Sequence, residues 1–177
     1  ETAGLTISDN CTADANLVVT SSDGTATGTC PISFTRTYTI TDSCENATTH
    51  TLSNNINDTT LPVVTGTLTA VSSNGCSIAD APVAMTTVAA LETAGLTISD
   101  NCTADANLVV TSSDGTATGT CPITFTRTYT IKDACNNATT ATQTININDT
   151  IAPVITGTLT ASNTDGCSIA AAPAAMT

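Results

Sequence analysis

Apolar and threonine residues alternate along residues 122–132, which is the strongest local pattern in the chain. A period of two over this length predicts a β-strand with one face buried and one face in water. The apolar face carries Ile123, Phe125, Arg127, Tyr129 and Ile131. The arginine is unusual on such a face, so we expect its stem to pack along Phe125 or Tyr129 while its guanidinium reaches an acid or the surface.

Shorter β-favouring runs occupy much of the remaining chain between turn residues. They predict strands at residues 61–70, 96–99, 107–113 and 140–148. Residues 86–94 predict a short helix that Thr86 or Thr87 can cap and Gly95 can end. Together these elements predict an all-β fold, a small antiparallel β-sandwich of Ig-like type.

An internal repeat organises the whole sequence. Residues 1–32 recur without a change as residues 92–123, and the similarity continues at the same offset of 91 residues to the end of the chain. We therefore predict tandem repeats of 91 residues. Residues 1–57 are the C-terminal part of one repeat without its first strand, residues 58–148 are a complete repeat, and residues 149–177 are the first strand and loop of the next.

This phase leaves two interpretations open. The sequence is a window on a longer chain of repeats, or residues 149–177 of one molecule complete residues 1–57 of the next by strand addition. In both cases the partners are neighbouring repeats or copies of the same chain.

The charge balance excludes two classes of partner. The formal net charge is −12, and the only cationic side chains are Arg36, Arg127 and Lys132. A nucleic acid or an anionic membrane surface would repel such a chain. We find no signal peptide and no apolar run long enough to cross a bilayer, so we expect no membrane insertion.

Eight cysteines, four per repeat, are the main candidate stabilising groups. They are Cys11, Cys30, Cys44, Cys76, Cys102, Cys121, Cys135 and Cys167. No CxxC pair occurs and the chain has one histidine, which disfavours zinc, whereas a thin core with few aromatic residues favours disulfides. Disulfides indicate an oxidising compartment, so we expect a secreted or cell-surface protein.

Counting strand directions assigns the cysteine loops to the two ends of the repeat. Cys102 and Cys135 follow ascending strands, whereas Cys76 and Cys121 follow descending ones. A bond from Cys121 to Cys135 would span about 30 Å, beyond the roughly 7 Å limit on Cα separation. We therefore predict bonds Cys102–Cys135, Cys76–Cys121 and, by repetition, Cys11–Cys44, each worth about 4 kcal/mol on the chain-entropy model. Cys30 and Cys167 would pair outside the fragment or between chains.

Acidic and amide side chains also meet at one end of the complete repeat. Asp100 lies in the sequence SDNC, Asp133 in KDAC, and Asn57 and Asp58 in the linker. Oxygen ligands at a junction are what Ca²⁺ requires, so these four residues are a candidate calcium site. Asx turns, which end strands with the same residue types, are the alternative interpretation.

No catalytic arrangement recurs in the repeat. The only histidine, His50, is replaced by Ala141 at the equivalent position. The acidic pair Asp9 and Asp42 recurs beside cysteines in both copies, which is typical of a scaffold rather than of an active site. We therefore predict that the chain is not an enzyme.

Four segments carry a family resemblance: NDTTLPVV, SDNC, TRTYTI and DSCENATT. They resemble the hyalin-repeat (HYR-like) Ig-fold modules of giant secreted surface proteins of Bacteroidota, including gliding-motility adhesins. The matching motifs are a D-x-x-x-P step at Asp58–Pro62 and Asp149–Pro153, and a D-x-C-x-N loop at Asp42–Asn46 and Asp133–Asn137. This chain has Glu45 and Asn136 where that loop usually has glycine.

The resemblance implies a non-enzymatic spacer module of a long surface stalk or adhesive fibre, exported by a dedicated secretion system, with surface glycans or other cells as further partners. It also implies O-glycans on threonine in Asp-Thr steps, which makes Thr59 and Thr150 candidate glycosylation sites. The second functional interpretation is a self-assembling filament subunit joined head to tail by strand complementation.

Overall fold

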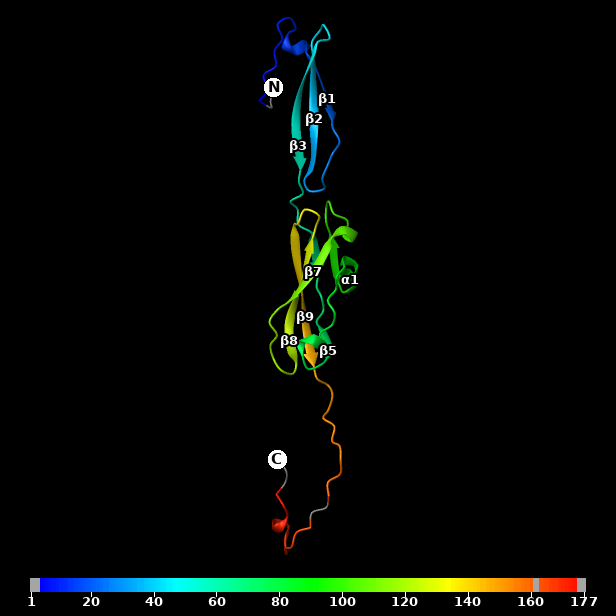
Figure 1. Ribbon diagram of the computed structural model, residues 1–177, viewed down its shortest axis with the longest axis vertical. Coiled ribbons are helices and arrows are strands. Elements are labelled where there is room, and N and C mark those ends of the chain that lie inside the picture. Colours follow the sequence, from blue (N-terminus) through cyan, green and yellow to red (C-terminus); the bar gives the residue numbers. More distant parts are fainter. Residues whose placement is uncertain (1–3, 161–162, 175–177) are drawn as a thin grey trace.

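The computed structural model describes residues 4–160 and 163–174, and these residues form mostly β-strands with little helix. Residues 1–3, 161–162 and 175–177, which belong to the predicted units 1–57 and 149–177, lie outside the described residues. Figure 1 shows three parts that follow one another along the long axis: an N-terminal sheet, a central unit of residues 58–148 and a C-terminal segment of residues 149–174.

The N-terminal sheet is antiparallel, with the order β1-β2-β3. Its strands are β1 (Val18–Asp23), β2 (Ile32–Thr41) and β3 (Ala47–Ile56). A short 3-10 helix, Asp14–Asn16, precedes β1. No further described strand pairs with this sheet.

The central unit contains a four-stranded and a two-stranded sheet. The first has the order β5-β9-β8-β7, with β5 parallel to β9, and the second pairs β4 with β6. The strands are β4 (Val63–Gly66), β5 (Val71–Asn74), β6 (Leu96–Ser99), β7 (Val109–Asp114), β8 (Ile123–Lys132) and β9 (Ala138–Asn148). Helix α1 (Val88–Thr93) leads into β6, and 3-10 turns lie at Ile78–Asp80 and Asp105–Asn107.

The core of the central unit lies between α1, β6 and the four-stranded sheet. Leu91 of α1 and Ile131 of β8 are fully buried, and Tyr129 is 1% exposed. A second cluster joins Phe125 of β8 to Ile145 and Ile147 of β9. The alternation read from residues 122–132 therefore places its apolar face in the core.

Arg127 shows how a charged residue is accommodated on this buried face. It is 5% exposed, and its guanidinium contacts Asp114 of β7 through Nε at 2.6 Å and Nη2 at 2.9 Å. Its Nη1 donates to the Pro82 carbonyl at 2.6 Å, and its guanidinium carbon lies 5.9 Å from the centroid of the Phe125 ring. The expected acid and the expected aromatic contact are both present.

Most predicted elements form close to their expected positions. The strand at residues 96–99 is β6, and the helix begins after Thr87, whose side chain accepts a hydrogen bond from Ala90 N at 3.2 Å. The predicted strand at 61–70 is shorter, because β4 ends at Gly66, where φ is +90°. Strand β5 was not predicted, because its sequence VSSN has no apolar alternation.

The N-terminal sheet and the β7-β8-β9 part of the central unit have the same register at an offset of 91 residues. Val18 pairs with Thr41 as Val109 pairs with Lys132, and the equivalence continues along the strands. The packing differs: Tyr38 of β2 is half-buried, whereas its equivalent Tyr129 is buried. In the described residues nothing equivalent to β4, β5 or α1 covers the N-terminal sheet.

The C-terminal segment runs away from the central unit without forming a strand in its described residues (Figure 1). It contains one 3-10 turn, Ile169–Ala171. Within the described part of the chain, no helix combines the length and apolar character needed to cross a membrane.

Candidate functional site

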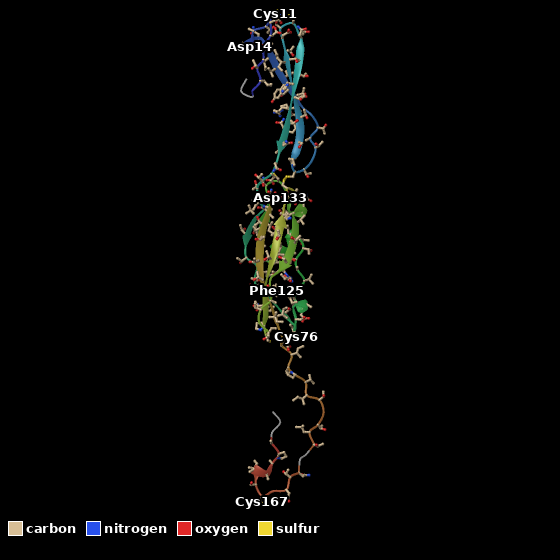
Figure 2. The ribbon with its side chains drawn as sticks, turned by 60° about the vertical axis from the view of Figure 1, so that its left-hand side comes forward. Cys11, Asp14, Cys76, Phe125, Asp133 and Cys167 are labelled. Atoms are coloured by element: carbon tan, nitrogen blue, oxygen red, sulfur yellow. A yellow bond between two sulfur atoms is a disulfide. The ribbon has the colours of Figure 1, made fainter. Side chains whose placement is uncertain are left out.

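Three aspartates meet where the N-terminal sheet joins the central unit. Asp58 lies in the linker before β4, Asp100 directly follows β6, and Asp133 directly follows β8. One carboxylate oxygen from each lies within 4.8 Å of the others. Figure 2 shows Asp133 at this end of the central unit and Cys76 at the opposite end. We call this end the junction and the three aspartates the junction triad.

Each aspartate uses its Oδ1 atom to shape its own loop. Asp100 Oδ1 accepts hydrogen bonds from the backbone of Cys102 at 3.0 Å and Thr103 at 2.7 Å. Asp133 Oδ1 accepts from the backbone of Cys135 and Asn137, both at 2.8 Å. Asp58 Oδ1 accepts from Thr60 N at 2.9 Å. The Asx-turn interpretation is therefore correct for these oxygens.

The remaining oxygens are less completely satisfied. Asp58 Oδ2 and Asp100 Oδ2 are buried from solvent and have no hydrogen-bond partner. Asp133 is 4% exposed, and its Oδ2 accepts from Asn137 Nδ2 at 2.7 Å. Buried polar atoms without a partner are uncommon because their desolvation is not compensated.

No cationic side chain of the described residues neutralises the triad. The two ion pairs among the described residues are Arg36–Asp23 and Arg127–Asp114, and neither involves an aspartate of the triad. The backbone N–H of Thr60 holds the pKa of Asp58 below its usual value despite partial burial. The Asp58 carboxyl therefore stays ionised at neutral pH, and the junction concentrates negative charge.

Asn137 connects the linker to the Asp133 loop. Its Nδ2 donates to the Asp58 carbonyl at 3.1 Å as well as to Asp133. Asn137 belongs to the D-x-C-x-N motif, but the motif alone did not predict a role for it in the site. Asn57, by contrast, was a predicted ligand, and its Oδ1 lies 3.1 Å from Cys30 Sγ.

A disulfide crosses the same junction. Cys30, in the loop before β2, is bonded to Cys135, in the loop after β8, with 5.1 Å between the Cα atoms. This corrects two predictions: Cys135 is not paired with Cys102, and Cys30 finds its partner inside the chain. Strand directions within one repeat cannot predict this bond, because it joins a loop of the N-terminal sheet to a loop of the central unit.

The other six cysteines are thiols in this structure: Cys11, Cys44, Cys76, Cys102, Cys121 and Cys167. The predicted bonds Cys11–Cys44 and Cys76–Cys121 are therefore not formed. Cys121 Sγ donates to Asn148 Oδ1 at 3.1 Å. At the equivalent position Cys30 Sγ also lies 3.1 Å from Asn57 Oδ1, but as a disulfide sulfur it has no hydrogen to donate. Cys121 thus occupies, at the far end of the central unit, the place that Cys30 occupies at the junction.

The Cys102 thiol lies beside the triad. Burial raises its pKa, and the negative charge of Asp58 raises it further. A raised pKa leaves little thiolate at neutral pH, so Cys102 is a poor nucleophile and a poor metal ligand there.

Incomplete copies of the triad occur at both ends of the chain. Asp9 Oδ1 accepts from Cys11 N at 2.9 Å and Thr12 N at 2.7 Å, as its equivalent Asp100 does. Asp42 Oδ1 accepts from Cys44 N and Asn46 N, as Asp133 does. Asp149, the equivalent of Asp58, caps its own turn through Ile151 N at 2.9 Å. Among the described residues, three such carboxylates lie close together only at the junction.

The two candidate glycosylation residues, Thr59 and Thr150, are exposed. Thr150 is also bound to Asn74 of β5, whose Oδ1 accepts from Thr150 N at 3.0 Å and lies 2.9 Å from its hydroxyl. His50 lies on β3 opposite Tyr38 and is exposed.

Comparison with known proteins adds no relative, because the chain matches neither a protein-family model nor a curated protein.

Proposed function

We propose that the chain is a non-enzymatic structural repeat of an extracellular surface adhesin or fibre, built from Ig-like sandwiches of 91 residues. The observation that carries this proposal is the Cys30–Cys135 disulfide, which links the N-terminal sheet to the unit that follows it in the chain. A bond across each junction of a repeated chain joins the repeats into one covalently braced rod.

The distribution of exposed groups supports a spacer. Threonines line the solvent face of the strands, and the net charge of −12 disfavours self-association through surface contacts. The disulfide fits an extracellular location, where oxidising conditions maintain such bonds. The resemblance of the D-x-x-x-P and D-x-C-x-N motifs to hyalin-type modules of secreted surface proteins points the same way.

Repetition also supports the absence of catalysis. Asp9 and Asp42 make the same loop hydrogen bonds as Asp100 and Asp133, so these carboxylates serve the turns of each copy. The histidine of the first copy lies on an exposed strand position that holds alanine in the second.

Immunolabelling of intact cells of the source organism with antibodies raised against this chain tests the proposal. We expect labelled structures that project from the cell surface, and labelling that requires permeabilised cells would contradict an extracellular role.

A second candidate, a filament subunit completed by strand exchange, is favoured by one observation. Ile155 and Leu159 of the C-terminal segment are 94% and 85% exposed, whereas their equivalents, Val64 and Leu68, pack against the core of the central unit. On the N-terminal sheet, Val19 is 54% exposed, whereas its equivalent Val110 is 8% exposed. The segment of one molecule would cover the sheet of the next.

Non-reducing electrophoresis separates the two candidates. Strand exchange would bring Cys121 of one molecule to Cys44 of the next, because these residues are the equivalents of Cys30 and Cys135. A covalent ladder that collapses on reduction and disappears in Cys44→Ser would establish the filament. A single monomer band would reject it and leave the spacer.

A further inference from the structure

We propose that Asp58, Asp100 and Asp133 bind one Ca²⁺ ion at the junction. The ion would lie between the linker and the two loops that follow β6 and β8, next to the Cys30–Cys135 disulfide. This site is independent of whether the chain serves as a spacer or as a filament subunit.

Two unpartnered oxygens, rather than acidity alone, favour cation binding by these side chains. Asp58 Oδ2 and Asp100 Oδ2 are both buried and both lack a hydrogen-bond donor, although Oδ1 of each residue is fully used by its own turn. A carboxylate oxygen withdrawn from water needs a donor or a cation to compensate its lost hydration. Neither of these two atoms accepts a hydrogen bond, and a metal ion would supply the compensation.

Charge leads to the same conclusion. Three carboxylates with oxygens within 4.8 Å repel one another, and no arginine or lysine among the described residues pairs with any of them. Like charges at this separation destabilise a fold unless an opposite charge lies between them. A divalent cation would offset most of this repulsion.

The donor set selects calcium among the common divalent ions. All three side chains offer hard oxygen atoms, which suit calcium and magnesium better than softer metal ions. Ca²⁺ accepts six to eight oxygen ligands in irregular geometry, so water or backbone carbonyls can fill the remaining positions. Mg²⁺ needs a stricter octahedral set and retains more water, which fits carboxylates from three separate loops less well.

Bound calcium would have a defined mechanical effect. Asp58 belongs to the linker that leaves the N-terminal sheet, while Asp100 and Asp133 belong to the central unit. A shared ion would fix the linker to both loops, and the disulfide beside it would hold the loop before β2 to the loop after β8. The junction would then resist bending at two adjacent points.

Isothermal titration of Ca²⁺ into the complete chain, oxidised and freed of metal with a chelator, tests the proposal. We expect one site per chain and a midpoint of thermal unfolding that rises by about 5–10 °C when calcium is a hundred times above its dissociation constant. Asp58→Asn and Asp100→Asn should each weaken the affinity at least tenfold. Asparagine keeps the Oδ1 acceptor of each turn, so the loops remain formed.

Asp9→Asn is the matched control. Asp9 makes the same two backbone hydrogen bonds as Asp100 but has no equivalent of Asp58 beside it. We expect its calcium affinity to equal that of the parent chain. Absence of binding by the parent chain, an equal loss in Asp9→Asn and Asp100→Asn, or Mg²⁺ binding as tight as that of Ca²⁺ would each overturn the assignment.

Discussion

At the scale of single residues, the same residue type can be compared at equivalent positions of the two copies, where its burial differs. Arg127 and Arg36 both pair with an aspartate of the neighbouring strand, yet the Arg127 side chain is 7% exposed and the Arg36 side chain is 37% exposed. The difference arises because α1, β4 and β5 cover only the central unit. The sequence predicts that each arginine can pair with an acid. It does not predict how much free energy of unfolding is lost when the pair is removed, because that depends on burial.

Asp114→Asn should lower the free energy of unfolding of the central unit by about 2 kcal/mol, because it leaves a buried guanidinium with one neutral acceptor in place of a carboxylate. Asp23→Asn, at the exposed equivalent pair, should have a clearly smaller effect. Urea denaturation of the two variants measures the difference. Equal effects would contradict the burial that we describe.

The same pair predicts a pH dependence. The hydrogen bond from Arg127 lowers the pKa of Asp114 in the folded state. A lowered folded pKa means that the stabilisation is complete above the unfolded value of about 3.9 and is lost as the pH falls through the folded value. Denaturation midpoints of the parent chain should therefore fall below about pH 4, and Asp114→Asn should reduce this dependence.

Backbone strain is the second residue-scale feature. Glu45 and Asn136 occupy the left-handed region, with φ of 69° and 67°, at the third residue after Asp42 and Asp133 in the two D-x-C-x-N loops. An L-residue other than asparagine or aspartate is disfavoured in this region because its Cβ crowds the backbone. Asn136 is compatible with this conformation from its residue type, whereas Glu45 gives no local signal of it.

Glu45→Gly should stabilise the chain by about 0.5–1 kcal/mol, since the relief of strain exceeds the added entropy of the unfolded state. Asn136→Gly should gain less, because asparagine tolerates this conformation. Thermal unfolding of both variants provides the measurement. A loss of stability in Glu45→Gly would show that the side chain, rather than the backbone, determines the turn.

At the scale of elements, periodicity predicted those strands whose apolar residues enter the core and missed the one that does not depend on them. Strand β8 was predictable because Phe125, Tyr129 and Ile131 alternate with threonine. Strand β5 contributes only Val71 to a core cluster and is held by parallel pairing with β9. Backbone pairing at a sheet edge does not depend on an apolar pattern of side chains, so the sequence did not predict β5.

Helix α1 is short enough to depend on its cap. Sequence allowed either Thr86 or Thr87 as the N-cap, and the structure assigns Thr87, which accepts from Ala90 N. Thr87→Ala should therefore cost about 1 kcal/mol of stability, whereas Thr86→Ala should change it little. Urea denaturation measures the free energy of unfolding of both variants, which differ only in which of two adjacent exposed threonines is replaced. An equal effect of both substitutions would contradict the assigned cap.

At the scale of the whole molecule, the junction combines features that a single repeat does not contain. The sequence predicts that Asp58, Asp100 and Asp133 lie together, because linker and loop positions follow from strand order, and the structure brings their oxygens within 4.8 Å. The disulfide could not be predicted in the same way, because Cys30 belongs to the preceding copy. Pairing between copies depends on how one unit is seated on the next, which strand direction within one unit cannot reveal.

The Cys30–Cys135 bond closes 105 residues of chain, and restricting an unfolded loop of this size is worth about 4–5 kcal/mol on the chain-entropy model. It also determines what a longer array should contain. By the offset of 91 residues, Cys121 would bond to the equivalent of Cys135 in a following repeat. Each junction would then carry the same covalent link.

Disulfide mapping of the chain purified without reductant is the most direct test of this covalent link between successive units. Thiols are alkylated first, the unreduced protein is digested with pepsin, and the linked peptides are identified by mass spectrometry. We expect Cys30 joined to Cys135, with the other six cysteines of the monomer alkylated. A peptide that joins Cys102 to Cys135, or alkylation of all eight cysteines, would contradict it.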